Sequence, residues 1–234
     1  GLDESEIEER FKKIIRYSDA NKEKKTLFIW PEGVFSGYNF DEIAIFKDLI
    51  LNNFSKKHTI ILGANRIDKK TGNVFNTMFV VNNNFEIIQS YDKQKLVPFG
   101  EFLPFEMFLK NFGLKKITEG YGSYSKGNKS ENIILDNLNI LPLICYEVIF
   151  TNFIQKSSNN TNLIVNISED GWFGKSIGPD QHFAKSILRA IENNTFLVRS
   201  ANQGISAIID NKGNIIKRMK RNEAGNIEFE VPLI

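Results

Sequence analysis

The fold of this chain is constrained most by a series of short apolar runs, each closed by a turn or by a polar residue. The first four runs span residues 26–32, 58–67, 73–81 and 85–92, and the turn sequences DKKTG and NNN separate the last three. Apolar runs of this length between turn residues are typical of buried strands. The same pattern predicts further strands over residues 139–147, 161–170, 195–201, 204–210, 213–219 and 226–231.

Segments between these runs have helical periodicity. Ile7, Phe11 and Ile14 recur at helical spacing behind an acidic first turn, which predicts a helix over residues 3–18. Strands that alternate with helices and then join into hairpins predict an α/β layered domain whose sheets are covered on both faces. The further expected helices lie near residues 40–54, 148–157 and 180–193.

The composition excludes several classes of protein. With 234 residues and 41% hydrophobic content, the chain can bury one large core, so we expect a single domain over residues 1–234. A formal net charge of +2 gives no field that favours nucleic acid as a partner. Cys145 is the only cysteine, and with only His58 and His182 beside it no Cys and His zinc site can form, so we expect no metal and no cofactor. Apolar runs are shorter than the roughly 18 residues of a membrane-spanning helix, and the N-terminus does not read as a signal peptide, so we expect the chain by itself to be soluble.

Three reactive side chains follow apolar runs. Glu32 follows FIWP, Lys93 follows FEIIQSYD and Cys145 follows NILPLI. In sheet enzymes, reactive groups gather at strand ends, where the chain leaves the core and can face a cleft. A thiolate is a strong nucleophile, a nearby carboxylate can take its proton, and an ammonium can stabilise an oxyanion. The set is self-consistent for acyl transfer, although packing or solvation explains each residue taken alone.

The sequence around these residues resembles that of the nitrilase superfamily, and specifically its apolipoprotein N-acyltransferase branch. The similar stretches include WPEGVFSG, YDKQKLVPFGEFLPFE, ICYEVIF and the long segment that begins VNISEDGWFGKSIGPDQH, and together they extend over residues 26–215. Soluble amidases of the superfamily usually read C-Y-D-x-R-F-P at the cysteine, whereas this chain reads CYEVIF. The resemblance is therefore to the acyltransferases more than to the amidases.

The resemblance implies a nitrilase-like αββα sandwich with a Glu-Lys-Cys triad. Cys145 would be the nucleophile, Glu32 the general base and Lys93 the cation that stabilises the oxyanion. Glu101 matches a further active-site carboxylate of the family. Independently of the resemblance, a carboxylate at this position would keep a buried Lys93 charged.

The reaction that the resemblance implies has two halves. Cys145 would attack an acyl ester of a phospholipid, release a lysophospholipid and hold the acyl chain as a thioester. The α-amine of the lipid-modified N-terminal cysteine of an apolipoprotein would then take the chain. Expected partners are a phospholipid donor, an apolipoprotein acceptor and a membrane surface, and the expected location is the bacterial inner membrane with the domain facing the periplasm. Because the family carries membrane-spanning helices and a first core strand that we do not find in this sequence, we expect a fragment of a longer enzyme.

Other residues are candidates for the walls of the pocket. Tyr146 and Glu147 match family residues that flank the nucleophile. Segment 98–114 is unusually apolar for a loop, and we expect it either to cover the core or to touch lipid as an arm. Trp172 fits a core position as well as a pocket wall. The candidate lipid or pocket contacts are Phe102, Phe105, Phe108 and Trp172.

Alternative functions stay open on the sequence alone. A soluble nitrilase-superfamily amidase would use the same Glu32, Lys93 and Cys145 on a small amide. The stretch GKSIG around Ser176 fits a serine nucleophile elbow, but no histidine follows His182, so we reject it. The Gly-rich stretch 120–127 matches no nucleotide-binding motif. A catalytically silent binding domain is disfavoured because all three reactive residue types are present.

Overall fold

Two β-sheets form the centre of the protein. The computed structural model describes residues 3–102, 123–128, 131–157, 160–230 and 232. The first sheet has the order β1-β2-β3-β4, in which β1 is parallel to β2 and the other pairs are antiparallel. Its strands are β1 (Thr26–Ile29), β2 (His58–Ile67), β3 (Val74–Val81) and β4 (Ile87–Asp92).

The second sheet has the order β10-β9-β8-β7-β6-β5. Its strands β6, β7 and β8 run parallel, and the outer pairs are antiparallel. The carboxyl ends of the three parallel strands lie at one edge of the sheet, where α/β proteins place their reactive groups. The strands are β5 (Ile133–Leu135), β6 (Leu138–Ile144), β7 (Leu163–Glu169), β8 (Phe196–Asn202), β9 (Ser206–Ile209) and β10 (Ile215–Met219).

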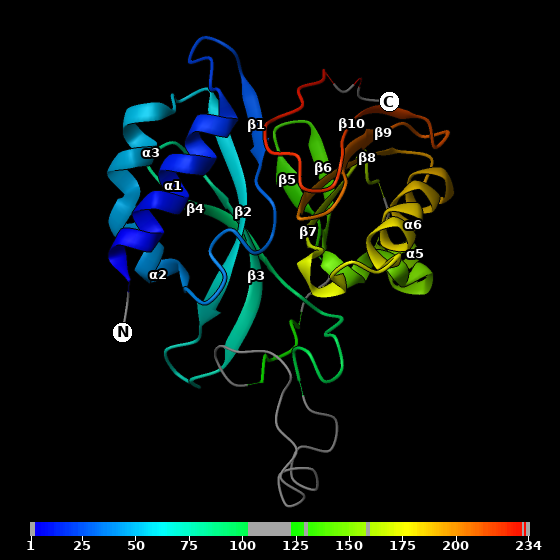
Figure 1. Cartoon of the computed structure of the whole chain (residues 1–234), viewed down its shortest axis with the longest axis horizontal. Coiled ribbons are helices and arrows are strands. Elements are labelled where there is room, and N and C mark those ends of the chain that lie inside the picture. Colours follow the sequence, from blue (N-terminus) through cyan, green and yellow to red (C-terminus); the bar gives the residue numbers. More distant parts are fainter. Residues whose placement is uncertain (1–2, 103–122, 129–130, 158–159, 231, 233–234) are drawn as a thin grey trace, which may run out of the picture.

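Helices cover the outer face of each sheet, which gives four layers (Figure 1). Successive residues of a strand point to opposite faces, so Leu62 contacts the helices of the first layer while Ile61 lies between the sheets. In the second sheet, Leu143 faces outward and Ile144 faces inward in the same way. The predicted αββα sandwich is therefore confirmed. The helices are α1 (Glu4–Ser18), α2 (Phe40–Ile43) and α3 (Lys47–Asn53) on the first sheet, and α5 (Thr151–Ser157) and α6 (Gly178–Glu192) on the second.

Two predicted helices have the wrong bounds. A capping box between Asn39 and Glu42 begins α2, but the 3₁₀ turn η1 (Ala44–Phe46) then separates it from α3. The break leaves Ile43 and Ile50 fully buried against the sheet. The helix expected from residue 148 begins at Thr151, because the residues before it form a 3₁₀ turn, η2 (Cys145–Ile149).

Two strand predictions also differ from the structure. No strand forms over residues 226–230. Side chains hold this segment instead, since the Asn226 amide donates to the Tyr17 carbonyl over 2.8 Å and Lys217 donates to the Glu228 carbonyl over 2.6 Å. The sequence prediction missed the three-residue strand β5, which pairs with β6 through a tight turn at Asp136, whose φ is 51°.

In the part of the chain that the structure describes, no helix is both long enough and apolar enough to cross a bilayer.

Candidate active site

Glu32 lies just beyond β1, with its carboxylate between the two sheets. One oxygen accepts the Asn76 amide over 2.7 Å, and the other accepts the backbone N–H of Glu169 over 3.0 Å. Gly63 in β2 makes room for this approach, because a Cβ there would lie 3.3 Å from the Glu32 Cα. The carboxylate therefore has a fixed orientation, as a general base requires.

Lys93 follows β4 and is 1% exposed. Its Nζ lies 2.9 Å from Glu101 Oε1 and 3.9 Å from Glu32 Oε1. The Asn76 amide donates to Glu101 over 2.9 Å as well as to Glu32, and the Val97 N–H donates to the other Glu101 oxygen over 2.9 Å. One buried ammonium thus lies between two carboxylates that share one amide donor.

Burial and charge act in opposite directions on this group of three. Burial by itself would lower the pKa of Lys93, but Glu101 and then Glu32 outweigh it and raise that pKa above its ordinary value. Burial raises the pKa of Glu32, and the Glu101 charge adds to the rise while Lys93 opposes it. Burial would raise the pKa of Glu101 too, but Lys93 outweighs it and holds that pKa below the ordinary value. Glu32 is therefore the more basic of the two carboxylates.

Glu147 fixes Lys93 relative to the turn that carries Cys145. It is fully buried, and one oxygen accepts the Tyr91 hydroxyl over 2.9 Å and the backbone N–H of Gln94 over 2.7 Å. The other oxygen accepts the Ile144 N–H over 2.9 Å. Burial is the largest cause of its raised pKa. Glu147, which the sequence analysis placed beside the nucleophile, thus joins the end of β6 to the chain just after Lys93.

Cys145 is the first residue after β6 and is 8% exposed. Its φ is 48°, in the left-handed region that residues with a Cβ rarely adopt. Burial and the Glu32 charge raise the pKa of its thiol to about 12, against the opposing effects of Lys93 and Ser168. The resting thiol is therefore protonated at neutral pH, and attack requires a base.

The backbone of Glu169 joins the nucleophile candidate to the base candidate. Its N–H donates to Glu32 Oε2, and its carbonyl oxygen lies 3.9 Å from Cys145 Sγ. The structure thus places Glu32, Lys93 and Glu101 in one group beyond the ends of β1 and β4, and it links Cys145, which follows β6, to this group through the backbone of Glu169.

A buried polar cluster behind Cys145 was not found from the sequence. The Cys145 carbonyl lies 3.1 Å from His182 Nε2, and His182 Nδ1 lies 3.0 Å from Asp170 Oδ1. Arg199 donates to both oxygens of Asp170, over 2.9 and 2.7 Å. Burial would raise the pKa of Asp170, but His182 and Arg199 outweigh it and lower that pKa to about 2. An arginine inside the apolar run FLVRSA was a signal of a buried partner.

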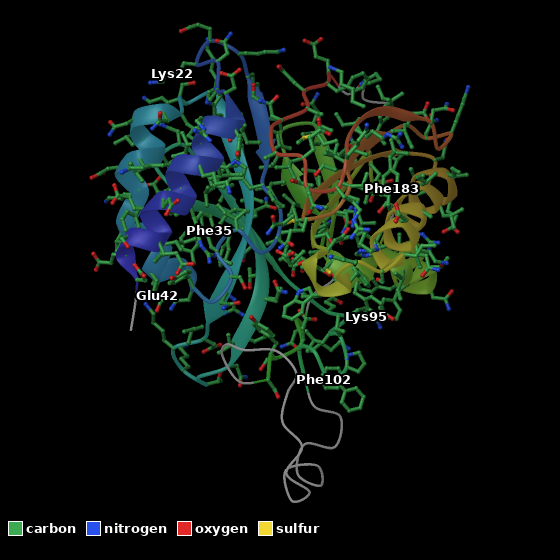
Figure 2. The ribbon with its side chains drawn as sticks, viewed as in Figure 1. Lys22, Phe35, Glu42, Lys95, Phe102 and Phe183 are labelled. Carbon is green, nitrogen blue, oxygen red and sulfur yellow. The ribbon has the colours of Figure 1, made fainter. Side chains whose placement is uncertain are left out.

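The remaining candidates lie farther from this group or outside the described residues. Tyr146 is partly buried, and its ring lies edge-on to Phe150 at 5.4 Å between centroids. Trp172 is 63% exposed, so it is no core residue. Phe102 is partly buried, and Figure 2 shows it with Lys95 at the end of the sandwich away from Lys22. Phe105 and Phe108 fall in segment 103–122, outside the described residues.

The described residues hold no group of three or more His, Cys, Asp and Glu side chains arranged to bind a metal ion.

Comparisons with known proteins agree with the fold and the motifs. A sequence profile of the carbon–nitrogen hydrolase family matches residues 3–233. A Saccharomyces cerevisiae member of branch 10 of the nitrilase superfamily has a similar crystal structure, with a TM-score of 0.67 and 19% identity over 93% of this chain and 82% of that one. This likeness concerns the fold alone.

Curated relatives are more similar in sequence. A Rickettsia typhi protein named apolipoprotein N-acyltransferase is 39% identical over 215 residues, which are 90% of this chain and 42% of the relative. A protein of the same name from Rhizobium leguminosarum bv. trifolii is 35% identical over 216 residues, 89% of this chain and 40% of the relative. The chain thus spans about two fifths of the length of these relatives.

Proposed function

The chain belongs to the carbon–nitrogen hydrolase family, and from this premise we propose that it is the catalytic domain of an apolipoprotein N-acyltransferase. The observation that carries the chemistry is the backbone of Glu169, which accepts the Cys145 thiol on one side and donates to the Glu32 carboxylate on the other. The curated relatives supply the substrate class through their name.

In the first half of the proposed reaction, Glu32 takes the proton of the Cys145 thiol, and the thiolate attacks the carbonyl carbon of a phospholipid ester. The tetrahedral oxyanion is stabilised by the Lys93 ammonium, which Glu101 keeps charged over 2.9 Å. As the intermediate collapses, the carbon–oxygen bond breaks and Glu32 returns the proton to the leaving oxygen. The products are a lysophospholipid and a thioester on Cys145.

In the second half, the terminal amine of a diacylglyceryl-cysteine apolipoprotein attacks the thioester. The carbon–sulfur bond breaks, and Glu32 passes the nitrogen proton to the Cys145 sulfur. Water must be kept out between the two halves, because it would hydrolyse the thioester. The 8% exposure of Cys145 supports this requirement.

We also propose that the site works against a membrane surface, at the bacterial inner membrane and on its periplasmic side. Support comes from exposed apolar side chains on two turns, since Trp172, in the 3₁₀ turn Gly171–Phe173, is 63% exposed and Phe99 is 48% exposed. Aromatic side chains with one wet and one apolar side suit a membrane interface.

The test is a transfer assay. The chain is mixed with vesicles of phosphatidylethanolamine and phosphatidylglycerol and with a synthetic diacylglyceryl-cysteine lipopeptide, and the lipopeptide is followed by mass spectrometry. We expect a mass gain of one acyl chain in an alkali-stable amide, lost in Glu32→Gln and in Cys145→Ser and kept in the exposed control Glu228→Gln. Hydrolysis of short amides without transfer to the lipopeptide would instead identify an amidase.

A further inference from the structure

The Glu169 side chain places a further carboxylate beside the proposed catalytic group, in addition to those of Glu32 and Glu101. It is the last residue of β7 and is partly exposed. One oxygen accepts the Gly171 N–H over 2.8 Å, and the other accepts the Asn202 amide over 2.6 Å. Both donors hold the carboxylate in place, and each oxygen keeps a lone pair for a further donor.

Two glycines leave the space that this carboxylate occupies. An added Cβ would lie 2.0 Å from Oε2 at Gly33 and 2.6 Å from Oε1 at Gly171. Gly33 also has a φ of 86°, which side chains with a Cβ rarely adopt. Because Gly33 directly follows Glu32, the Glu169 carboxylate lies against the backbone of the proposed base.

The charge state of Glu169 suits proton exchange near neutral pH. Burial raises its pKa to about 6, and the Glu32 charge adds to the rise against the Gly171 and Asn202 hydrogen bonds. A carboxyl with a pKa close to the working pH can both take and release a proton. Its partial exposure gives the proton a path to solvent.

In the second half of the proposed reaction the amine must lose two protons, and Glu32 transfers only one of them. An α-amine has a pKa of about 8 and arrives mostly as an ammonium with three protons. It must lose one proton to gain a lone pair for attack, and a second as the amide forms. Glu32 passes the second proton to the Cys145 sulfur, so the first proton needs another acceptor.

We propose that Glu169 is this acceptor, a catalytic carboxylate that binds the α-ammonium of the incoming apolipoprotein and removes its first proton. In this step a nitrogen–hydrogen bond breaks, an oxygen–hydrogen bond forms on Glu169, and the free amine attacks the Cys145 thioester. The protonated Glu169 then releases the proton to solvent. The inference rests on the proposed function and names a residue for its second half.

The test separates the two halves with Glu169→Gln, which keeps the size of the side chain. The thioester is first loaded on Cys145 from vesicles, and its decay on addition of lipopeptide is then timed between pH 6.5 and 9.5. At pH 7 only about a tenth of the amine is unprotonated in solution. The variant can use only this unprotonated fraction, so we expect it to be about tenfold slower than the wild type at pH 7 and to match it by pH 9. Hydroxylamine, which is uncharged at pH 7, should cleave the thioester of both proteins at equal rates.

The rates distinguish a catalytic role of Glu169 from a structural one. A loss in Glu169→Gln that is the same at all pH values, or that extends to hydroxylamine, would assign the residue a structural role and overturn the inference. Equal rates of variant and wild type at pH 7 would do so as well. Failure of the wild-type chain to load an acyl group would instead refute the proposed function, and Glu228→Gln reports any effect of losing a carboxylate elsewhere.

Discussion

Replacing Lys93 with methionine removes the only ammonium between Glu32 and Glu101 in the described site while keeping the length of the side chain. Two largely buried carboxylates, each 13% exposed, then face each other with one shared amide donor, Asn76. Removing one partner of a buried ion pair costs about 3–5 kcal/mol, because the remaining charge has no compensation. We expect a loss of that size in the free energy of unfolding at pH 7.5.

The loss should shrink as the pH falls. In the wild type the pKa of Glu101 is held low, so the stability it contributes is present above its ordinary pKa and is lost only in acid. Without Lys93, burial raises that pKa, and the folded variant takes up a proton that its unfolded state does not bind. Each pH unit over which this holds is worth about 1.4 kcal/mol, so the gap to the wild type should be about 2 kcal/mol smaller at pH 5.5 than at pH 7.5.

Urea unfolding followed by tryptophan fluorescence measures both values, since Trp30 is 3% exposed and reports loss of the core. Lys126→Met is the matched control, because Lys126 is exposed and its loss should change the free energy by less than about 0.5 kcal/mol. A loss of unfolding free energy in Lys93→Met below about 1 kcal/mol at pH 7.5, or a loss that does not change with pH, would refute the stabilising contacts of Lys93 with Glu32 and Glu101.

Three further predictions concern other parts of the site. Asp170→Asn should cost about 3–5 kcal/mol in urea unfolding because Arg199 stays buried. The gap between the wild type and this variant should shrink by about 2 kcal/mol between pH 4 and pH 2, because the pKa of Asp170 is about 2 in the folded wild type and the unfolded chain takes up the proton first. Gly127→Ala should lower the free energy of unfolding by about 1–3 kcal/mol, because the new Cβ would lie 2.2 Å from the Asp92 carbonyl, and it should slow thioester formation through displacement of Lys93. Trp172→Ser should weaken vesicle sedimentation and leave the melting temperature within about 2 °C of the wild type; unchanged sedimentation would exclude a lipid contact.

The layered fold was predictable because periodicity is a local property of sequence. Runs such as 58–67 and 73–81 are apolar and form strands that are buried along most of their length, and the family match confirms the resemblance that the motifs indicated. The ends of elements were less predictable. The sequence predicts a strand through residue 147 and a helix from residue 148, but the left-handed Cys145 and the Glu147 hydrogen bonds select the 3₁₀ turn Cys145–Ile149.

The shape of the site depended on packing between sheets, which no local pattern encodes. The motifs named Glu32 and Cys145, but their joint contact with the backbone of Glu169 follows from how β1 and β7 face each other. The cluster of His182, Asp170 and Arg199 joins residues 12–29 positions apart, and all three lie outside the predicted site residues because no local pattern shows such contacts. Roles for Glu32, Lys93 and Cys145 remain predictions of the proposed mechanism.

The most direct test of the account is intact mass spectrometry of the chain after exposure to vesicles of phosphatidylethanolamine and phosphatidylglycerol. We predict a mass gain of one acyl chain that maps to Cys145, is removed by hydroxylamine and is absent from Glu32→Gln. A folded sample with its thiol intact and no acyl adduct, or an adduct on any other residue, would contradict the account.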